Sequence, residues 1–214
     1  MIPDNVEKLG REEADYGEKI DSSVFANCSN LESVIISKQL NEICNKNFAN
    51  CVSLKTFKSS VDTEVSDNVI FIPQNIKIIR EQAFTNCSGI ETLIFSSGVE
   101  TTEREVFSRC DKLTRIDIPE TLTTVGESCF YKCEGLVDIQ LNNTTTVLGE
   151  SCFSRCSGLT EISISCASIK EEAFSYCENL VKATILNGSL DKHIFGKCSL
   201  LKYLSIPYLP ANLG

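Results

Sequence analysis

The sequence predicts an α/β repeat solenoid in which each repeat contains a short strand, a return segment and a short helical segment. A phenylalanine recurs at intervals of 21 to 23 residues through most of the 214-residue chain. A cysteine follows each phenylalanine after three residues, and an aliphatic residue follows three residues later. A frame that holds over eight repeats indicates a stack of equivalent coils around one core. The phenylalanines are Phe25, Phe48, Phe84, Phe107, Phe130, Phe153, Phe174 and Phe195.

The strand of each repeat begins at the aliphatic position. In the repeat that starts at Leu113, apolar Ile116 and Ile118 alternate with polar residues, which is typical of a strand with one buried face. Pro119 ends this strand because it has no N–H for a sheet hydrogen bond. The same reading predicts nine parallel strand segments, at 31–36, 54–59, 69–72, 90–95, 113–118, 136–141, 159–164, 180–185 and 201–206.

The rest of the repeat returns the chain to its starting side. Leu122 and Val125 are expected to point into the core from an irregular segment, and Gly126 to permit a tight turn. The stretch ESCFYKC, residues 127–133, is long enough for one or two helical turns. Phe130 and Cys133 are three residues apart, so a helical turn would place both on its inner face.

The motif IP-x-x-L-x-x-V-G-x-x-C-F-x-x-C-x-x-L-x-x-I resembles the Treponema pallidum-type leucine-rich repeat of BspA-like proteins. The resemblance covers nearly the whole chain, and the isoleucine–proline pair stands at 72–73, 118–119 and 206–207. It implies a right-handed leucine-rich-repeat array with a parallel β-sheet on the concave face and short helical turns opposite. It also implies a surface protein of a bacterium or parasitic protist that adheres to host proteins or makes other protein contacts.

The chain is expected to form a single domain, 1–214. Its N-terminal half-repeat has Ala14 at the phenylalanine position, and the interval from Phe48 to Phe84 exceeds the usual 23 residues by 13. The open edge of the strand at 201–206 suggests either a truncated chain or end-to-end self-association. The expected parts are an N-terminal cap and half repeat at 1–24, about eight repeats at 25–206 with a loop insertion at 59–68, and a tail at 207–214.

The net charge of −9 argues against a nucleic-acid backbone or an anionic membrane as partner. The basic residues are scattered, without a run. No stretch approaches 18 apolar residues, so no membrane insertion is expected. The polar N-terminus resembles no signal peptide, which at face value predicts the cytoplasm. The family resemblance predicts the cell surface instead.

Eight of the twelve cysteines belong to the repeat frame, and we interpret them as buried thiols in small apolar slots. The four others are Cys44, Cys129, Cys152 and Cys166. Two C-x-x-x-C pairs on neighbouring repeats also permit a four-thiolate zinc site. Alanine or valine stands at the equivalent of Cys129 elsewhere, which favours a packing role. We therefore expect no metal and no cofactor.

The single histidine, His193, lies two residues before Phe195 and is interpreted as a surface residue. The sequence has no glycine-rich phosphate loop, serine-nucleophile elbow or paired-histidine motif. We therefore predict a protein that is not an enzyme.

The outward side chains of the sheet are the expected binding surface for a protein partner. Phe71 and Ile94 lead to the hypothesis of an apolar patch rimmed by polar groups. The alternative is that these side chains lean against neighbouring repeats or lie under a loop. We predict either a surface adhesin or antigen that binds host or partner proteins, or an intracellular scaffold or regulatory subunit. The candidate binding residues are Ile35, Val69, Phe71, Ile94, Arg115, Asp117, Asp138, Gln140, Glu161 and Tyr203.

Overall fold

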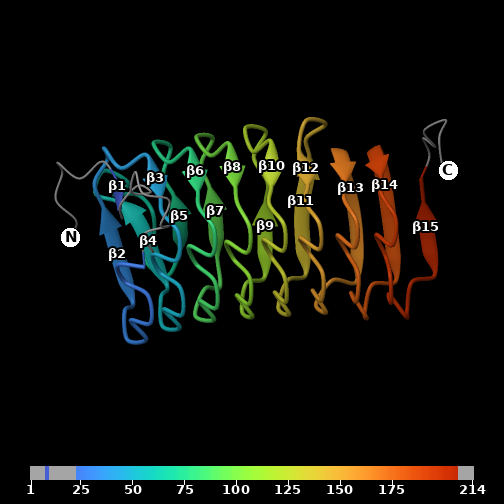
Figure 1. The fold of residues 1–214 in the computed structure, drawn as a ribbon, viewed down its shortest axis with the longest axis horizontal. Helices are drawn as coiled ribbons and strands as arrows, with labels where there is room; N and C mark the ends of the chain where they lie inside the picture. The colour runs from blue at the N-terminus through green and yellow to red at the C-terminus, as the bar shows by residue number, and fades with distance from the viewer. Residues whose placement is uncertain (1–7, 10–22, 207–214) are drawn as a thin grey trace, which may run out of the picture.

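The computed structural model describes residues 8–9 and 23–206. Most of the predicted cap at 1–24 and the whole tail at 207–214 lie outside the described residues. The described chain winds in successive coils along the long axis of the molecule (Figure 1). Every strand pair is parallel. The predicted parallel-strand solenoid is therefore confirmed.

One side of the solenoid is a row of nine parallel strands in chain order, which we call the strand face. Each strand overlaps one of the nine segments predicted from the alternation of apolar and polar residues. Between β7 and β9 the pairing is reduced to a bridge from Thr92 to Arg115. The strands are β2 (Ser33–Ile36), β4 (Thr56–Ser59), β5 (Ile70–Ile72), β7 (Leu93–Phe95), β9 (Arg115–Asp117), β11 (Asp138–Asn142), the first parts of β13 (Glu161–Ile169) and β14 (Lys182–Leu190), and β15 (Tyr203–Ser205).

A second side, which we call the return ladder, is also hydrogen-bonded in parallel. The sequence predicted irregular structure here, because two-residue strands are too short to show an alternating pattern. Leu122 and Val125 are fully buried, as expected. The ladder consists of β1 (Lys8–Leu9), β3 (Glu42–Ile43), β6 (Ile78–Ile79), β8 (Thr101–Thr102), β10 (Thr124–Val125), β12 (Val147–Leu148) and the last residues of β13 and β14.

β13 and β14 run without a break from the strand face into the return ladder. They belong to the repeats with the shorter 21-residue interval, which lack the isoleucine–proline pair. Without that proline, every backbone N–H in this stretch can donate a hydrogen bond to a neighbouring strand. The strands change direction at register shifts beside Ser165 instead. The shorter repeat therefore converts two strands and their connection into one bent strand.

The third side, which we call the turn face, carries the phenylalanines and contains no helix within the described residues. The predicted short helical turns are wrong. In each of seven coils the residues two before and two after the phenylalanine are both left-handed, for example Gln82 (φ 57°) and Asn86 (φ 56°). The N–H groups of Gln82, Phe84 and Asn86 donate to carbonyls of the next coil at 2.9, 2.9 and 2.7 Å. These bonds between coils replace the i to i−4 bonds of a helix.

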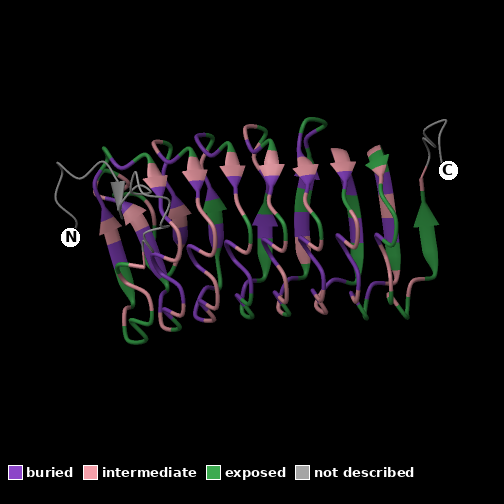
Figure 2. Ribbon diagram, in the orientation of Figure 1, coloured by how far each residue is buried: buried purple, intermediate pink, exposed green. Residues whose placement is uncertain are grey.

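The core lies between the three sides and runs the length of the solenoid (Figure 2). Phenylalanine rings of consecutive coils stack with centroids 5.2 to 5.8 Å apart. The close approach of coils also explains Gly126, which has no positive φ. A Cβ atom there would lie 2.2 Å from the carbonyl oxygen of Glu103 in the preceding coil. Glycine is required by the packing of coils and not by a special turn conformation.

The frame cysteines form a ladder of hydrogen bonds beside the phenylalanine stack. Seven thiols donate to the phenylalanine carbonyl of the preceding coil at 3.0 to 3.5 Å. All twelve cysteines are free, and all except Cys28 and Cys198 are buried. Burial raises the pKa of the Cys129 and Cys156 thiols to about 12. The interpretation as buried thiols is confirmed for six of the eight frame cysteines and is wrong for Cys28, which is exposed, and for Cys198, which is half-buried.

The long interval between Phe48 and Phe84 adds a strand to the strand face. β4 and β5 both lie between these two phenylalanines in the sequence. The rings of Phe48 and Phe84 nevertheless stack with their centroids 5.3 Å apart. Phe57 of β4 fills the added space with its ring edge-on to both, at 5.5 and 5.3 Å. Residues 60–68 connect the two strands, and the Lys58 ammonium donates to the Val65 carbonyl at 2.7 Å. This connection is thereby held against the outer side of β4.

Candidate functional site

Two rows of side chains point outward from the strand face, because alternate residues of a strand face opposite sides. Strand register aligns the residues of each row from coil to coil. All ten candidate residues lie in these rows. The first row is Ile35, Lys58, Phe71, Ile94, Asp117, Gln140, Ser163, Thr184 and Ser205, and the second is Ser33, Thr56, Val69, Thr92, Arg115, Asp138, Glu161, Lys182 and Tyr203.

The N-terminal half of the strand face carries all the apolar residues of the two rows except Tyr203, interspersed with polar side chains. Phe71 and Ile94 are paired in register on β5 and β7. Ile94 is 44% exposed, whereas Ile35, Val69 and Phe71 are half-buried. Lys58 separates Ile35 from Phe71 in the first row, and its ammonium is bent away toward residues 60–68. The exposed apolar surface therefore centres on Ile94 and Phe71.

The middle of the strand face is charged, and its charged side chains pair with one another. The Arg115 guanidinium pairs with Asp117 and with Asp138, each at 3.0 Å. The hydrogen bond and charge of Asp117, followed by the charge of Asp138, raise the pKa of Arg115. Gln140 donates to Asp138 at 2.9 Å. These polar side chains satisfy one another, in contrast to the apolar residues beside them.

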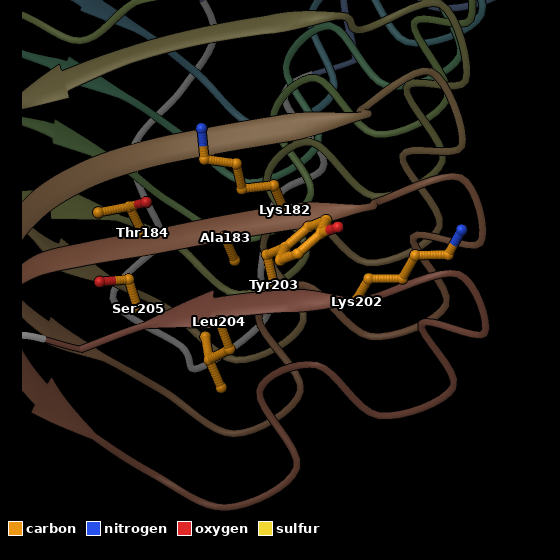
Figure 3. A pocket seen from close by; sticks show the side chains of 7 residues that line it. All are labelled: Lys182, Ala183, Thr184, Lys202, Tyr203, Leu204 and Ser205. Atoms are coloured by element: carbon orange, nitrogen blue, oxygen red, sulfur yellow. The ribbon is translucent and has the colours of Figure 1, made fainter.

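The C-terminal end of the strand face has a shallow pocket of about 350 Å³ between β14 and β15. Figure 3 shows the Tyr203 ring beside Lys182, on the outward side of the sheet. Tyr203 is 64% exposed, and the Lys182 ammonium pairs with Glu161 at 3.4 Å. Leu204 lies on the inner side but is 51% exposed, since no described coil covers it. End-to-end association through 201–206 stays a prediction.

Potential metal ligands do not cluster among the described residues. No group of three or more histidine, cysteine or acidic residues in this part of the chain could hold a metal ion. His193 is exposed, and its Nδ1 lies 3.5 Å from Glu171. In the same part of the chain, no helix is long and apolar enough to cross a bilayer.

Reasoning along the sequence missed a basic column on the turn face. Arg109, Lys132, Arg155 and Lys197 are far apart in the chain, but each stands two residues after a phenylalanine. The fold therefore stacks them. In an alignment of the repeats on phenylalanine, these cations stand one position before the frame cysteines.

The stacked coils, the common phenylalanine core and the open strand face define a leucine-rich-repeat solenoid, a class whose members are typically non-enzymatic protein-interaction modules. The model of the BspA type leucine rich repeat region matches in six copies, over residues 14–71, 63–181 and 136–211. The chain belongs to the BspA-type leucine-rich repeat family.

Solved structures with the same fold come from several bacteria. The T. pallidum leucine-rich repeat protein TpLRR superposes with a TM-score of 0.67 at 23% identity, over 79% of this chain and 78% of that one. A leucine-rich repeat protein from Eubacterium ventriosum gives 0.61 at 17% identity, over 86% and 68%. The pneumococcal vaccine antigen PcpA gives 0.52 at 16% identity, over 75% and 40%. No curated protein matches the chain significantly.

Proposed function

We propose that the chain is a protein-binding module that engages its partner through the strand face, and that it acts as a surface adhesin. The observation that carries the proposal is the contrast between the two halves of that face. Arg115 and its neighbours already pair with one another, whereas Phe71 and Ile94 present apolar surface to solvent. Burial of such surface against a partner is favourable.

The proposed patch consists of Phe71 and Ile94, flanked by Val69 and Ile35. Its rim is polar: residues 60–68 lie on one side, and Asp117 and Arg115 lie on the other. An apolar centre within a polar rim is the usual anatomy of a protein interface. The ten candidate residues therefore form the proposed binding surface, with the patch as its energetic centre.

The patch is tested by comparing the proteins retained by the immobilised chain and by a double variant, Phe71→Lys with Ile94→Lys. A partner should be retained by the wild-type chain and lost by this variant, because each lysine would have to be desolvated in the interface. The control is Val137→Lys, which replaces a 56% exposed apolar residue outside the two rows. Equal retention by the wild-type chain and a folded double variant contradicts the proposal.

An intracellular scaffold is the second candidate function, and the twelve free thiols favour it. Free cysteines persist most readily in a reducing compartment. Antibody staining of intact and permeabilised cells distinguishes the two candidates. Staining of intact cells supports the adhesin, and staining that requires permeabilisation supports the scaffold.

A further inference from the structure

The residues two positions after each phenylalanine form a continuous column along the turn face. Their backbones are in register, since Arg109, Lys132 and Arg155 each donate an N–H to the next coil, at 2.7 to 2.9 Å. All of them are left-handed, with φ between 56° and 63°. The column consists of Asn27, Asn50, Asn86, Arg109, Lys132, Arg155, Tyr176 and Lys197.

Side chains of this column touch from coil to coil. Asn50 donates to Asn27, and Asn86 donates to Asn50, both at 2.9 Å. Farther along, the Arg155 guanidinium lies 4.3 Å from the centre of the Tyr176 ring. The column is therefore a continuous surface. Its side chains are amides as far as Asn86 and mainly cations from Arg109 onward.

The left-handed backbone does not explain the cations. Asparagine and glycine tolerate this conformation best, and the first three coils do use asparagine. A matched column two residues before each phenylalanine has the same conformation but mixed chemistry, with no predominance of cations. It consists of Lys46, Gln82, Glu105, Ser128, Ser151, Glu172 and His193.

Neutralisation by neighbouring carboxylates does not explain the cations either. Among the described residues, no ion pair joins Arg109, Lys132, Arg155 or Lys197 to a carboxylate. Burial, followed by the charge of Glu134, raises the pKa of nearby Asp111, and Arg109 and Lys132 only partly oppose this. Like charges held close together on neighbouring coils repel one another. The column therefore retains an electrostatic cost that its interactions with Asp111 and Tyr176 only partly offset.

We propose that Arg109, Lys132, Arg155 and Lys197 bind a linear anionic glycan, a carboxylated or sulfated polysaccharide that lies along the solenoid axis. The rings beneath the column repeat at 5.2 to 5.8 Å, a spacing close to the length of one sugar ring. Successive anionic sugars can therefore meet successive coils. This surface is separate from the proposed protein-binding patch.

The surroundings of the column favour a glycan over a nucleic acid. Glu127, Glu150 and Glu171 lie five residues before column members, so a broad duplex would meet their negative charge. A single-stranded nucleic acid would need aromatic faces on which its bases stack. Tyr176 is the aromatic member of the column, and Arg155 already covers its ring.

The test measures binding of the full chain to heparin, a sulfated glycan, and to alginate, a carboxylated one, at physiological salt. The column variant carries Arg109→Asn, Lys132→Asn and Arg155→Asn. Asparagine suits the left-handed backbone, so the thermal midpoint should equal or exceed that of the wild-type chain. The matched control carries Lys77→Asn, Lys170→Asn and Lys192→Asn, which removes the same charge from paired lysines outside the column.

We expect the wild-type chain to bind at least one of the two glycans, the column variant to bind it about tenfold more weakly or worse, and the control to change affinity less than about twofold. Absence of wild-type binding to both glycans overturns the proposal. Equal weakening by the two triple variants also overturns it, since binding would then follow net charge alone. Tighter binding of single-stranded oligothymidine or polyglutamate would assign the column to a different polymer and reject the glycan.

Discussion

At the residue scale, each ladder cysteine combines an apolar body with a weak hydrogen-bond donor. The carbonyl oxygen of Phe107 accepts the N–H of Cys110 at 3.3 Å and the thiol of Cys133 at 3.2 Å. Both lone pairs of this buried oxygen are therefore used. Alanine would leave one acceptor site unused, and leucine would not fit between the coils. Cysteine recurs at the same position of each repeat because its thiol satisfies both the packing and the hydrogen-bonding requirement.

Raised thiol pKa values predict that stability falls in alkaline solution. Burial raises the pKa of Cys129 and Cys156 from 9.0 to about 12. Their contribution is fully present below about pH 9 and is lost as the pH rises toward 12, because the unfolded thiols ionise first. The free energy of unfolding should fall by about 1.4 kcal/mol per pH unit for each such thiol. Urea unfolding between about pH 8 and pH 11 measures this slope.

Cys129→Ala is the control for the alkaline effect. Alanine already occupies the equivalent positions Ala83 and Ala173, both fully buried, so the fold accommodates it. The variant should lose the share of the pH slope that belongs to one thiol. A slope unchanged by the substitution would show that other groups cause the loss of stability.

At the element scale, the turn around each phenylalanine depends on two left-handed residues. Ser151 has a φ of 54° and Arg155 a φ of 63°, on either side of Phe153. A residue with a Cβ atom has a higher energy in this conformation, by about 1–2 kcal/mol. Hydrogen bonds to the next coil, such as that from Ser151 to Glu171 at 3.0 Å, compensate for the cost.

Ser151→Gly should therefore stabilise the protein, by about 0.5–1 kcal/mol in the free energy of unfolding. The matched control is Ser157→Gly in the same coil, where φ is not positive and glycine should destabilise by about 0.5–1 kcal/mol. Thermal or urea unfolding of the two variants checks the opposite signs. Destabilisation by both would mean that the left-handed strain is not relieved by glycine.

At the scale of the whole molecule, stability arises from contacts between neighbouring coils. The strand pairs and the ring stacks join each coil to the next along the row. Such a stack is quasi-one-dimensional, so its stability is approximately a sum of coil and interface terms. Removing one complete coil should then be tolerated, whereas removing part of a coil should not.

Deletion of residues 130–152 removes one 23-residue period and joins Cys129 to Phe153. The sequence Glu-Ser-Cys precedes both phenylalanines, so the junction retains its native neighbours. The shortened protein should fold with a free energy of unfolding lower by about 1–3 kcal/mol, one coil's share. Deletion of 130–141 should destabilise the protein far more, because it leaves an incomplete coil and breaks the register between the coils on either side of it. Circular dichroism and urea unfolding compare the two, and similar stability of both would refute the additive stack.

The strand segments were predictable because Ile116 and Ile118 show the two-residue period of a strand with one buried face. The helical turns were not, since Phe130 and Cys133 have a spacing that suits a helix equally well. The left-handed conformations of Ser128 and Lys132 exclude the helix, and they arise together with hydrogen bonds to the next coil.

The candidate binding rows could be located from the sequence, because strand alternation and the fixed frame place Phe71 and Ile94 on the outer side. The charge pairing in the middle of the face could not, because it depends on which side chains the register brings together. Arg115 and Asp138 are 23 residues apart and meet at 3.0 Å. The basic column is a different case, because the repeat alignment already places Arg109 and Lys132 at equivalent positions and only their charge was overlooked.

By itself, the sequence determined the repeat, the inward frame of phenylalanine, cysteine and leucine, and the outward rows of the strands. These depend on the local order of apolar and polar residues. The tertiary structure alone decided the return ladder, the left-handed turns and the pairing of Arg115 with Asp138. The physical reason is that the hydrogen-bond partners and charged neighbours of each coil lie in the adjacent coil, and the pattern within one repeat does not specify them.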